Sequence, residues 1–252
     1  MEDLSTKPVA KIDDLCSTLW GSESGNMYLG YLQDDQRRLY ELHCIECLHT
    51  NQGENGPISL ETLLINRGAL RLSRQVRYQI ASVVASSLLQ LETTPWLTGK
   101  LEKKNIMFYQ QDSKVLVDRP YIFHSFKPAR YSQTARARSE RGSSSRFATR
   151  DSLSSLGILL LELCFGETIE SQHLRERHLG QDGQPIAGTD FLTAYDWVEM
   201  VSEEDPALEN VIKCCVFCNF PEKADWGNQN FTQAVYINVV EPLEKLVDQR
   251  FK

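Results

Sequence analysis

The fold is decided by the stretch Asp151-Ser-Leu-Ser-Ser-Leu-Gly-Ile-Leu-Leu-Leu-Glu-Leu-Cys-Phe-Gly166. Between Leu153 and Phe165 this stretch is apolar almost all round. A helix that is apolar on every side lies at the centre of a soluble protein, because no face of it favours water. Gly166 is typical of the residue that ends such a helix. We therefore expect a central buried helix over residues 153–165.

Other helices are predicted on both sides of this stretch. Residues 73–91 carry apolar side chains at positions 76, 80, 83, 84, 88 and 91, the spacing of one helix face. A loop then leads to Asn105, and the Ile-Met-Phe that follows predicts a strand. Three more helices are predicted over 191–201, 206–218 and 232–247, the last with a candidate kink at Pro242. The polar, Gly-rich residues 167–189 predict irregular structure.

The first 70 residues have a different pattern. Residues 27–45 predict two strands joined by a turn at Asp34-Asp35-Gln36. Ser59 precedes an apolar run and predicts a helix N-cap, with Thr62 in place of the glutamate of a complete capping box. A small strand-rich part is thus followed by a large helical part. The expected fold class is α+β.

Composition limits the function classes. The chain has 252 residues, 41% hydrophobic and 24% charged, with a formal net charge of −7 that argues against nucleic-acid binding. No apolar run reaches the roughly 18 residues of a membrane span, and no secretory signal opens the sequence. The seven cysteines show no small-domain disulfide spacing, which favours reduced thiols. We expect a cytoplasmic, soluble protein.

Residues 127–150 are rich in serine and arginine. They hold seven basic residues against Glu140 alone, a local charge of about +6. Little in this stretch would enter a core, so we expect a mobile basic loop. Four serines that follow arginines are candidate regulatory phosphorylation sites: Ser139, Ser143, Ser144 and Ser145. The alternatives are a merely solvated loop, or a contact with an acidic partner or an anionic membrane surface.

Taken together, the 75–105 and 151–166 segments resemble the large lobe of a protein kinase. The second segment contains the Ser155-Leu-Gly157 of the family's central helix, then Glu162 and the terminal Gly166. The resemblance implies a protein-kinase-like fold with a reduced, strand-rich small lobe and hinge over 1–58. A mainly α-helical large lobe would cover 59–252.

The same alignment shows which catalytic groups are missing. Lys100 stands at the position of the family's aspartate base, five residues before Asn105. Asp118 lies at the spacing of the family's metal-binding aspartate, but Arg119-Pro120 follow it instead of Phe-Gly. No Gly-x-Gly-x-x-Gly motif or suitably placed lysine precedes residue 70. We therefore expect no catalytic residue and no required cofactor, with Asn105 and Asp118 as vestigial candidates for weak Mg–ATP binding.

A narrower resemblance rests on Trp96-Leu, Asn105, Pro120-Tyr-Ile-Phe and the 156–166 run. These residues are similar to kinase-like domains of filamentous fungi, in multidomain proteins related to the prion-inhibition and propagation group. Such domains sometimes lie beside HeLo-type death-inducing domains. The resemblance implies a signalling role, with a protein partner or another domain of a longer parent chain.

Two other functional classes receive less support. Cys44-Ile-Glu-Cys47 and Cys215-Val-Phe-Cys218 could form a zinc site, but 171 positions separate them, so buried thiols are the preferred interpretation and no metal is predicted. A Ser-His-Asp hydrolase lacks the Gly-x-Ser-x-Gly elbow.

The preferred hypothesis is a catalytically inactive pseudokinase that acts as a regulatory or scaffold module in intracellular signalling. One alternative is an atypical active Ser/Thr-type kinase that uses Glu102 or Asp118 with Asn105. The other is an interaction module without a ligand. Both stay open at this point.

Overall fold

The computed structural model describes residues 11–15, 17–18, 28–33, 37–43, 56–66, 71–94, 97, 100–111, 114–117, 120–123 and 142–251. The chain divides into two compact units. One comprises residues 1–54 with 126–128, and the other comprises 55–125 with 129–252. Helices and small antiparallel sheets make the protein α+β, as predicted.

The smaller unit contains a β-hairpin. Strands β1 (Tyr28–Gln33) and β2 (Leu39–His43) pair antiparallel, with Gln33 opposite Leu39 and a register shift between Tyr28 and Gly30. The two predicted strands are confirmed, whereas the predicted turn at 34–36 lies outside the described residues. Ile12 is buried in this unit, and its N–H donates to the carbonyl of Tyr31 at 2.8 Å.

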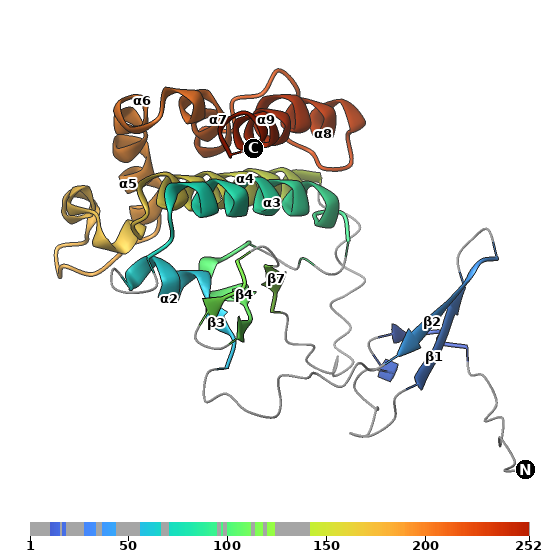
Figure 1. Ribbon diagram of the computed structural model, residues 1–252. Helices are drawn as coiled ribbons and strands as arrows, with labels where there is room; N and C mark the ends of the chain where they lie inside the picture. The colour runs from blue at the N-terminus through green and yellow to red at the C-terminus, as the bar shows by residue number, and fades with distance from the viewer. Residues whose placement is uncertain are drawn as a thin grey trace, which may run out of the picture. The chain divides into compact units, whose positions relative to one another are not determined.

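The larger unit is built around two long helices. Helix α3 (Arg74–Leu91) lies beside helix α4 (Gly142–Phe165), and the C-terminal helices cover one side of this pair (Figure 1). Leu156 and Leu163 of α4 are fully buried, as predicted for the central helix. The remaining helices are α2 (Leu60–Ile65), α5 (Thr189–Trp197), α6 (Val201–Glu204), α7 (Pro206–Val216), α8 (Gln229–Val235) and α9 (Glu241–Phe251).

Short strands lie on the opposite side of the helix pair (Figure 1). Strands β3 (Ile58–Ser59), β4 (Ile106–Phe108) and β7 (Tyr121–Ile122) form an antiparallel sheet in the order β3-β4-β7. Strand β3 runs directly into α2, where Ser59 accepts the N–H of Thr62 at 3.1 Å as the predicted N-cap. A second, two-stranded sheet joins β5 (Gln110–Gln111) to β6 (Lys114–Val115).

The prediction of a mobile loop over 127–150 is wrong for its last nine residues. Helix α4 begins at Gly142, eleven residues before the predicted start. Within this extension Thr149 and Ser152 are buried, and Ser152 donates a hydrogen bond to Glu92 at the end of α3. No proline interrupts this stretch, so its sequence does not block a helix, although its serines have modest helix propensity.

Two predicted helices are interrupted. The helix expected over 191–201 becomes α5, a 3₁₀ turn over Val198–Met200, and α6. The helix expected over 232–247 contains a π-helical turn over Tyr236–Val240 between α8 and α9. Pro242 follows this turn, and it lacks the N–H that an α-helix would direct to Asn238. The wider turn thus lies where the sequence predicted a kink.

Candidate functional site

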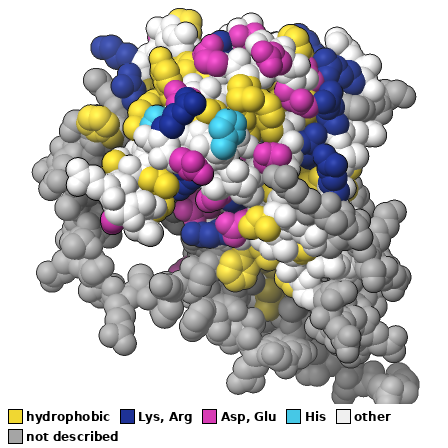
Figure 2. Space-filling model, turned by 90° about the vertical axis from the view of Figure 1, so that its left-hand side faces the viewer, with side chains coloured by type: hydrophobic (Ala, Val, Ile, Leu, Met, Phe, Trp, Pro, Cys, Tyr) yellow, Lys and Arg dark blue, Asp and Glu magenta, His cyan; other side chains and the backbone are white. Residues whose placement is uncertain are grey.

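A groove of about 670 Å³ crosses the larger unit. Its lining comes from residues 100–104, from one face of α4, from the segment between α4 and α5, and from the end of α7. Figure 2 shows the face of the molecule that carries α5, where basic, acidic and hydrophobic side chains are interleaved.

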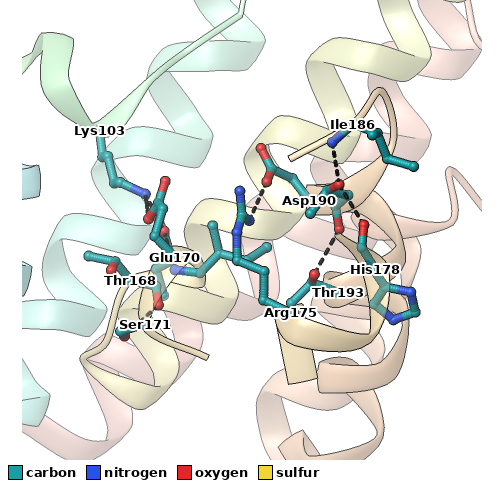
Figure 3. Close-up of polar contacts among 12 residues, drawn as sticks. Lys103, Thr168, Glu170, Ser171, Arg175, His178, Ile186, Asp190 and Thr193 are labelled. Atoms are coloured by element: carbon teal, nitrogen blue, oxygen red, sulfur yellow. Dashed lines mark hydrogen bonds and ion pairs between the residues drawn. The ribbon is translucent and has the colours of Figure 1, made fainter. Parts of the chain in front are cut away.

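An ion-pair cluster that runs from a buried carboxylate to an exposed one lines this groove. The ammonium of Lys103 lies 2.5 Å from Oε1 of Glu162 and 2.7 Å from Oε2 of Glu170 (Figure 3). Glu162 is nearly inaccessible to solvent, and its Oε1 also accepts the N–H of Ile169 at 2.8 Å. The cluster joins the 100–105 segment to α4 and to the chain that leaves α4.

Burial and charge compete in this cluster. Burial raises the pKa of Glu162 to about 7, although the Lys103 charge acts in the opposite direction. Burial would also lower the pKa of Lys103, but the two carboxylates outweigh it and raise that pKa. For Glu170, burial is outweighed by the hydrogen bond from Lys103, which holds its pKa below the usual range. Lys103 therefore stays charged and is fully engaged inside the protein.

A second polar cluster fixes the wall of the groove between α4 and α5. Arg175 pairs with Asp190 at the start of α5 (Figure 3). The hydroxyl of Thr189 donates to the carbonyl of His178 at 2.8 Å and accepts the N–H of Ile186 at 2.9 Å. These contacts give residues 173–190, which comprise a 3₁₀ helix over His173–His178 and an irregular stretch before α5, a fixed path along the groove.

The predicted base position, Lys100, lies at the groove with its side chain exposed. Its neighbour Glu102, the alternative base, pairs with Lys104 at 2.7 Å. Asn105 is half-buried and does not line the groove; its carbonyl accepts the N–H of Phe123 at 2.7 Å. Of these two residues, Lys100 therefore lines the groove and Asn105 does not.

Several predicted site residues cannot be placed. Asp118 and Ser139 lie outside the described residues. Ser143, Ser144 and Ser145 belong to the first turns of α4, but their side chains also lie outside the described part of the structure. Their proposed regulatory role stays a prediction.

Comparison with known families adds one assignment. A family model described as "Domain of unknown function (DUF7580)" matches residues 2–250. The chain belongs to this family. No curated protein gives a match. The DUF7580 match spans both compact units, so both are parts of one family domain.

In this DUF7580 chain the central residues of the groove did not stand out from the sequence alone. Glu162 was noted only as part of the central-helix motif, and Glu170, Arg175 and Asp190 were not singled out. One signal was available, since Glu162 is the only charged residue between Leu153 and Phe165. A lone carboxylate in a buried helix requires a cation, and Lys103 supplies it.

No metal-binding cluster of three or more His, Cys, Asp or Glu residues occurs in the described part of the DUF7580 chain. Cys44 and Cys47, one half of the zinc alternative, lie outside that part. In the other half, burial raises the pKa of the Cys218 thiol, although nearby Arg150 acts in the opposite direction. None of the helices in the described residues is long and apolar enough to cross a membrane.

Proposed function

We propose that this domain is a kinase-like module that transfers no phosphate and acts as a regulatory or scaffold element in intracellular signalling. The observation that carries the proposal is the state of the 100–104 segment. In the kinase-like alignment Lys100 stands at the position of the base, and in the structure the nearby Glu102 is paired with Lys104. A general base must accept a proton, which a lysine ammonium cannot do and an ion-paired carboxylate does poorly.

The arrangement of the larger unit supports a kinase-like interpretation. An amphipathic helix, α3, precedes the 100–105 turn, a short strand follows at β4, and the buried helix α4 comes next. This is the order that the sequence resemblance implies for a large lobe. The small hairpin β1–β2 supports the idea of a reduced small lobe.

The surface beside the groove supports binding to a protein. Phe191, Leu192 and Tyr195 of α5 are 40%, 42% and 54% exposed, and Ile186 nearby in sequence is 55% exposed. Large apolar side chains gathered on one helix at the edge of a groove are typical of interaction sites. We propose that the groove and this face of α5 bind a segment of a protein partner, or of another domain of a longer parent chain.

The proposal is tested by titrating the protein with ATP, with and without Mg²⁺, in a thermal-shift assay combined with a phosphoryl-transfer assay. A ligand that binds only the folded state raises the melting temperature. We expect no transfer and no Mg²⁺-dependent shift that requires Asp118. Metal-dependent turnover that is lost in Asp118→Ala or in Glu102→Gln would instead establish the atypical-kinase alternative.

A further inference from the structure

A second, much smaller pocket lies in the larger unit, away from the groove. Its volume is about 120 Å³, and it shares no lining residue with the groove. It is formed where the end of α2, the segment before α3 and the end of α4 meet. Its polar side chains are Asn66, Arg71, Arg77 and Glu167.

Arg77 is the unusual member of this pocket. Its side chain extends from the first turn of α3 and the residue is only 8% exposed, yet its Nε is buried without a hydrogen-bond partner. In the part of the chain that the structure describes, no carboxylate forms an ion pair with it. Arg74, one turn earlier, is by contrast paired with Glu204. A buried cation without an ion-pair partner is costly, and the guanidinium of Arg77 is such a cation.

The backbone leaves space for the Arg77 guanidinium at the end of α4. Gly166 has a φ of +73°, and a Cβ added there would overlap Nη1 of Arg77. Glycine is therefore required at this position both by its left-handed conformation and by the close approach of the cation. The end of the central helix and the position of the guanidinium are coupled through this residue.

The charges around the pocket leave a positive excess. Arg71, which also lines the pocket, is exposed and has no ion pair in the described residues, so the lining holds two arginines. Glu167 is the carboxylate of the lining, and it already accepts a hydrogen bond from Nε2 of Gln172 at 2.8 Å. Burial lowers the pKa of Arg77, in agreement with an environment that offers it too little negative charge.

We infer that this pocket binds a small phosphate-type oxyanion between Arg71 and Arg77. Planar guanidinium groups donate pairs of hydrogen bonds that match the oxygens of such an anion. The volume equals that of about four water molecules and is far below the roughly 300 Å³ of typical cofactor pockets. It therefore fits one phosphoryl group and not a nucleotide. The source is either free phosphate or a phosphorylated side chain.

The test is isothermal titration of the whole chain with inorganic phosphate, with chloride at equal ionic strength as the blank. We expect wild type to bind phosphate and Arg77→Met to bind it about tenfold more weakly or not at all, because charge-assisted hydrogen bonds are lost. Arg77→Met is also expected to melt at the same temperature as wild type or higher, since it removes an unpaired buried charge. If Arg77→Met remains folded, its weaker binding of phosphate cannot be attributed to a loss of structure.

Arg74→Met is the matched control, because it removes a cation from the same helix but outside the pocket. It is expected to bind phosphate as wild type does. A parallel titration with N-acetyl-phosphoserine amide identifies the source, since tighter binding of that compound than of phosphate indicates a phosphorylated side chain. No binding of either compound by wild type, or unchanged binding by Arg77→Met, would overturn the inference.

Discussion

The hydroxyl of Tyr78 donates a buried hydrogen bond to Oδ2 of Asp205 at 2.9 Å, across 127 positions of the sequence. The same carboxylate caps α7 by accepting the N–H of Ala207 at 3.1 Å, and it pairs with Arg250 of α9. Burial opposes its ionisation, but the hydrogen bonds from Arg250 and Tyr78 prevail and hold the pKa of Asp205 below its usual value. One side chain therefore joins α3, α7 and α9.

Replacing this carboxylate should strongly destabilise the protein. We expect Asp205→Ala to lower the free energy of unfolding by about 3–4 kcal/mol, because the cap and the buried ion pair are lost together. Tyr78→Phe removes only the hydroxyl and should cost about 1 kcal/mol. Urea unfolding monitored by circular dichroism measures both. The nearby, exposed Glu203→Gln is the control and should change stability by less than about 0.5 kcal/mol.

The Asp205 contacts also predict a response to acid. Because the folded-state pKa is depressed, the contribution of this carboxylate is fully present above the unfolded-state pKa of about 4. It is lost as the pH falls through the folded-state value. In Asp205→Asn, unfolding free energy measured from pH 6 to pH 3 should therefore fall less than in wild type. An equally steep fall in the variant would contradict this linkage.

Glu92 should give the opposite pH dependence. Burial raises its pKa to about 7, so between the unfolded-state pKa of about 4.5 and pH 7 the folded state holds the proton more tightly. The contribution of Glu92 to wild-type stability should thus decline across this window as the pH rises. Glu92→Gln should be more stable than wild type by about 1–2 kcal/mol at pH 8 and equal to it near pH 4, the size being reduced by partial exposure.

The measurement is urea unfolding of Glu92→Gln and wild type at pH 4, 6 and 8. Exposed Glu222→Gln serves as a matched control and should follow the wild-type profile. If the unfolding free energy of Glu92→Gln instead varies with pH as that of wild type does, then Glu92 is already ionised in the folded protein at neutral pH.

In the Lys103 cluster, the effects of separate substitutions on the free energy of unfolding should not add up. Lys103→Met leaves Glu162 buried without its cation and should cost about 3–5 kcal/mol. The double variant Lys103→Met with Glu162→Gln should recover part of that loss, because the remaining group is neutral. Lys104→Met removes an exposed pair and should change stability far less than Lys103→Met does. A double-mutant cycle from urea unfolding checks this, and simple additivity would show that Lys103 and Glu162 are not coupled.

Much of the fold was predictable, because the spacing of apolar residues along the chain indicates which face of a helix or strand is buried. The central helix, the helix over 73–91, the hairpin strands and the Ser59 cap all depend on residues close in sequence. The N-terminal extension of α4 was not predictable, since it depends on Thr149 and Ser152 meeting other elements. The break at Val198 follows no local pattern in the sequence, whereas the wider turn over Tyr236–Val240 lies where Pro242 predicted a kink.

The site was less predictable than the fold. The sequence placed Lys100 and Glu102 in a segment that proves to line the groove. It could not show that Lys103 points inward while Lys104 stays at the surface, because adjacent lysines look alike until a partner is known. The partner, Glu162, lies 59 positions away. Arg77 was also missed, since an arginine in an amphipathic helix is ordinarily solvated.

The close packing of α4 on α7 yields a final prediction. A Cβ at Gly157 would lie 2.7 Å from both the backbone nitrogen and Cγ2 of Val216, closer than such contacts occur. Gly157→Ala should therefore destabilise the protein by about 1–3 kcal/mol, although alanine is the better helix former by about 1 kcal/mol. Ser155→Ala, two residues earlier and half-buried, is the control and should change stability by less than about 1 kcal/mol. Stabilisation by Gly157→Ala would mean that the two helices separate easily, and that the groove, which Val216 helps to line, has no fixed width.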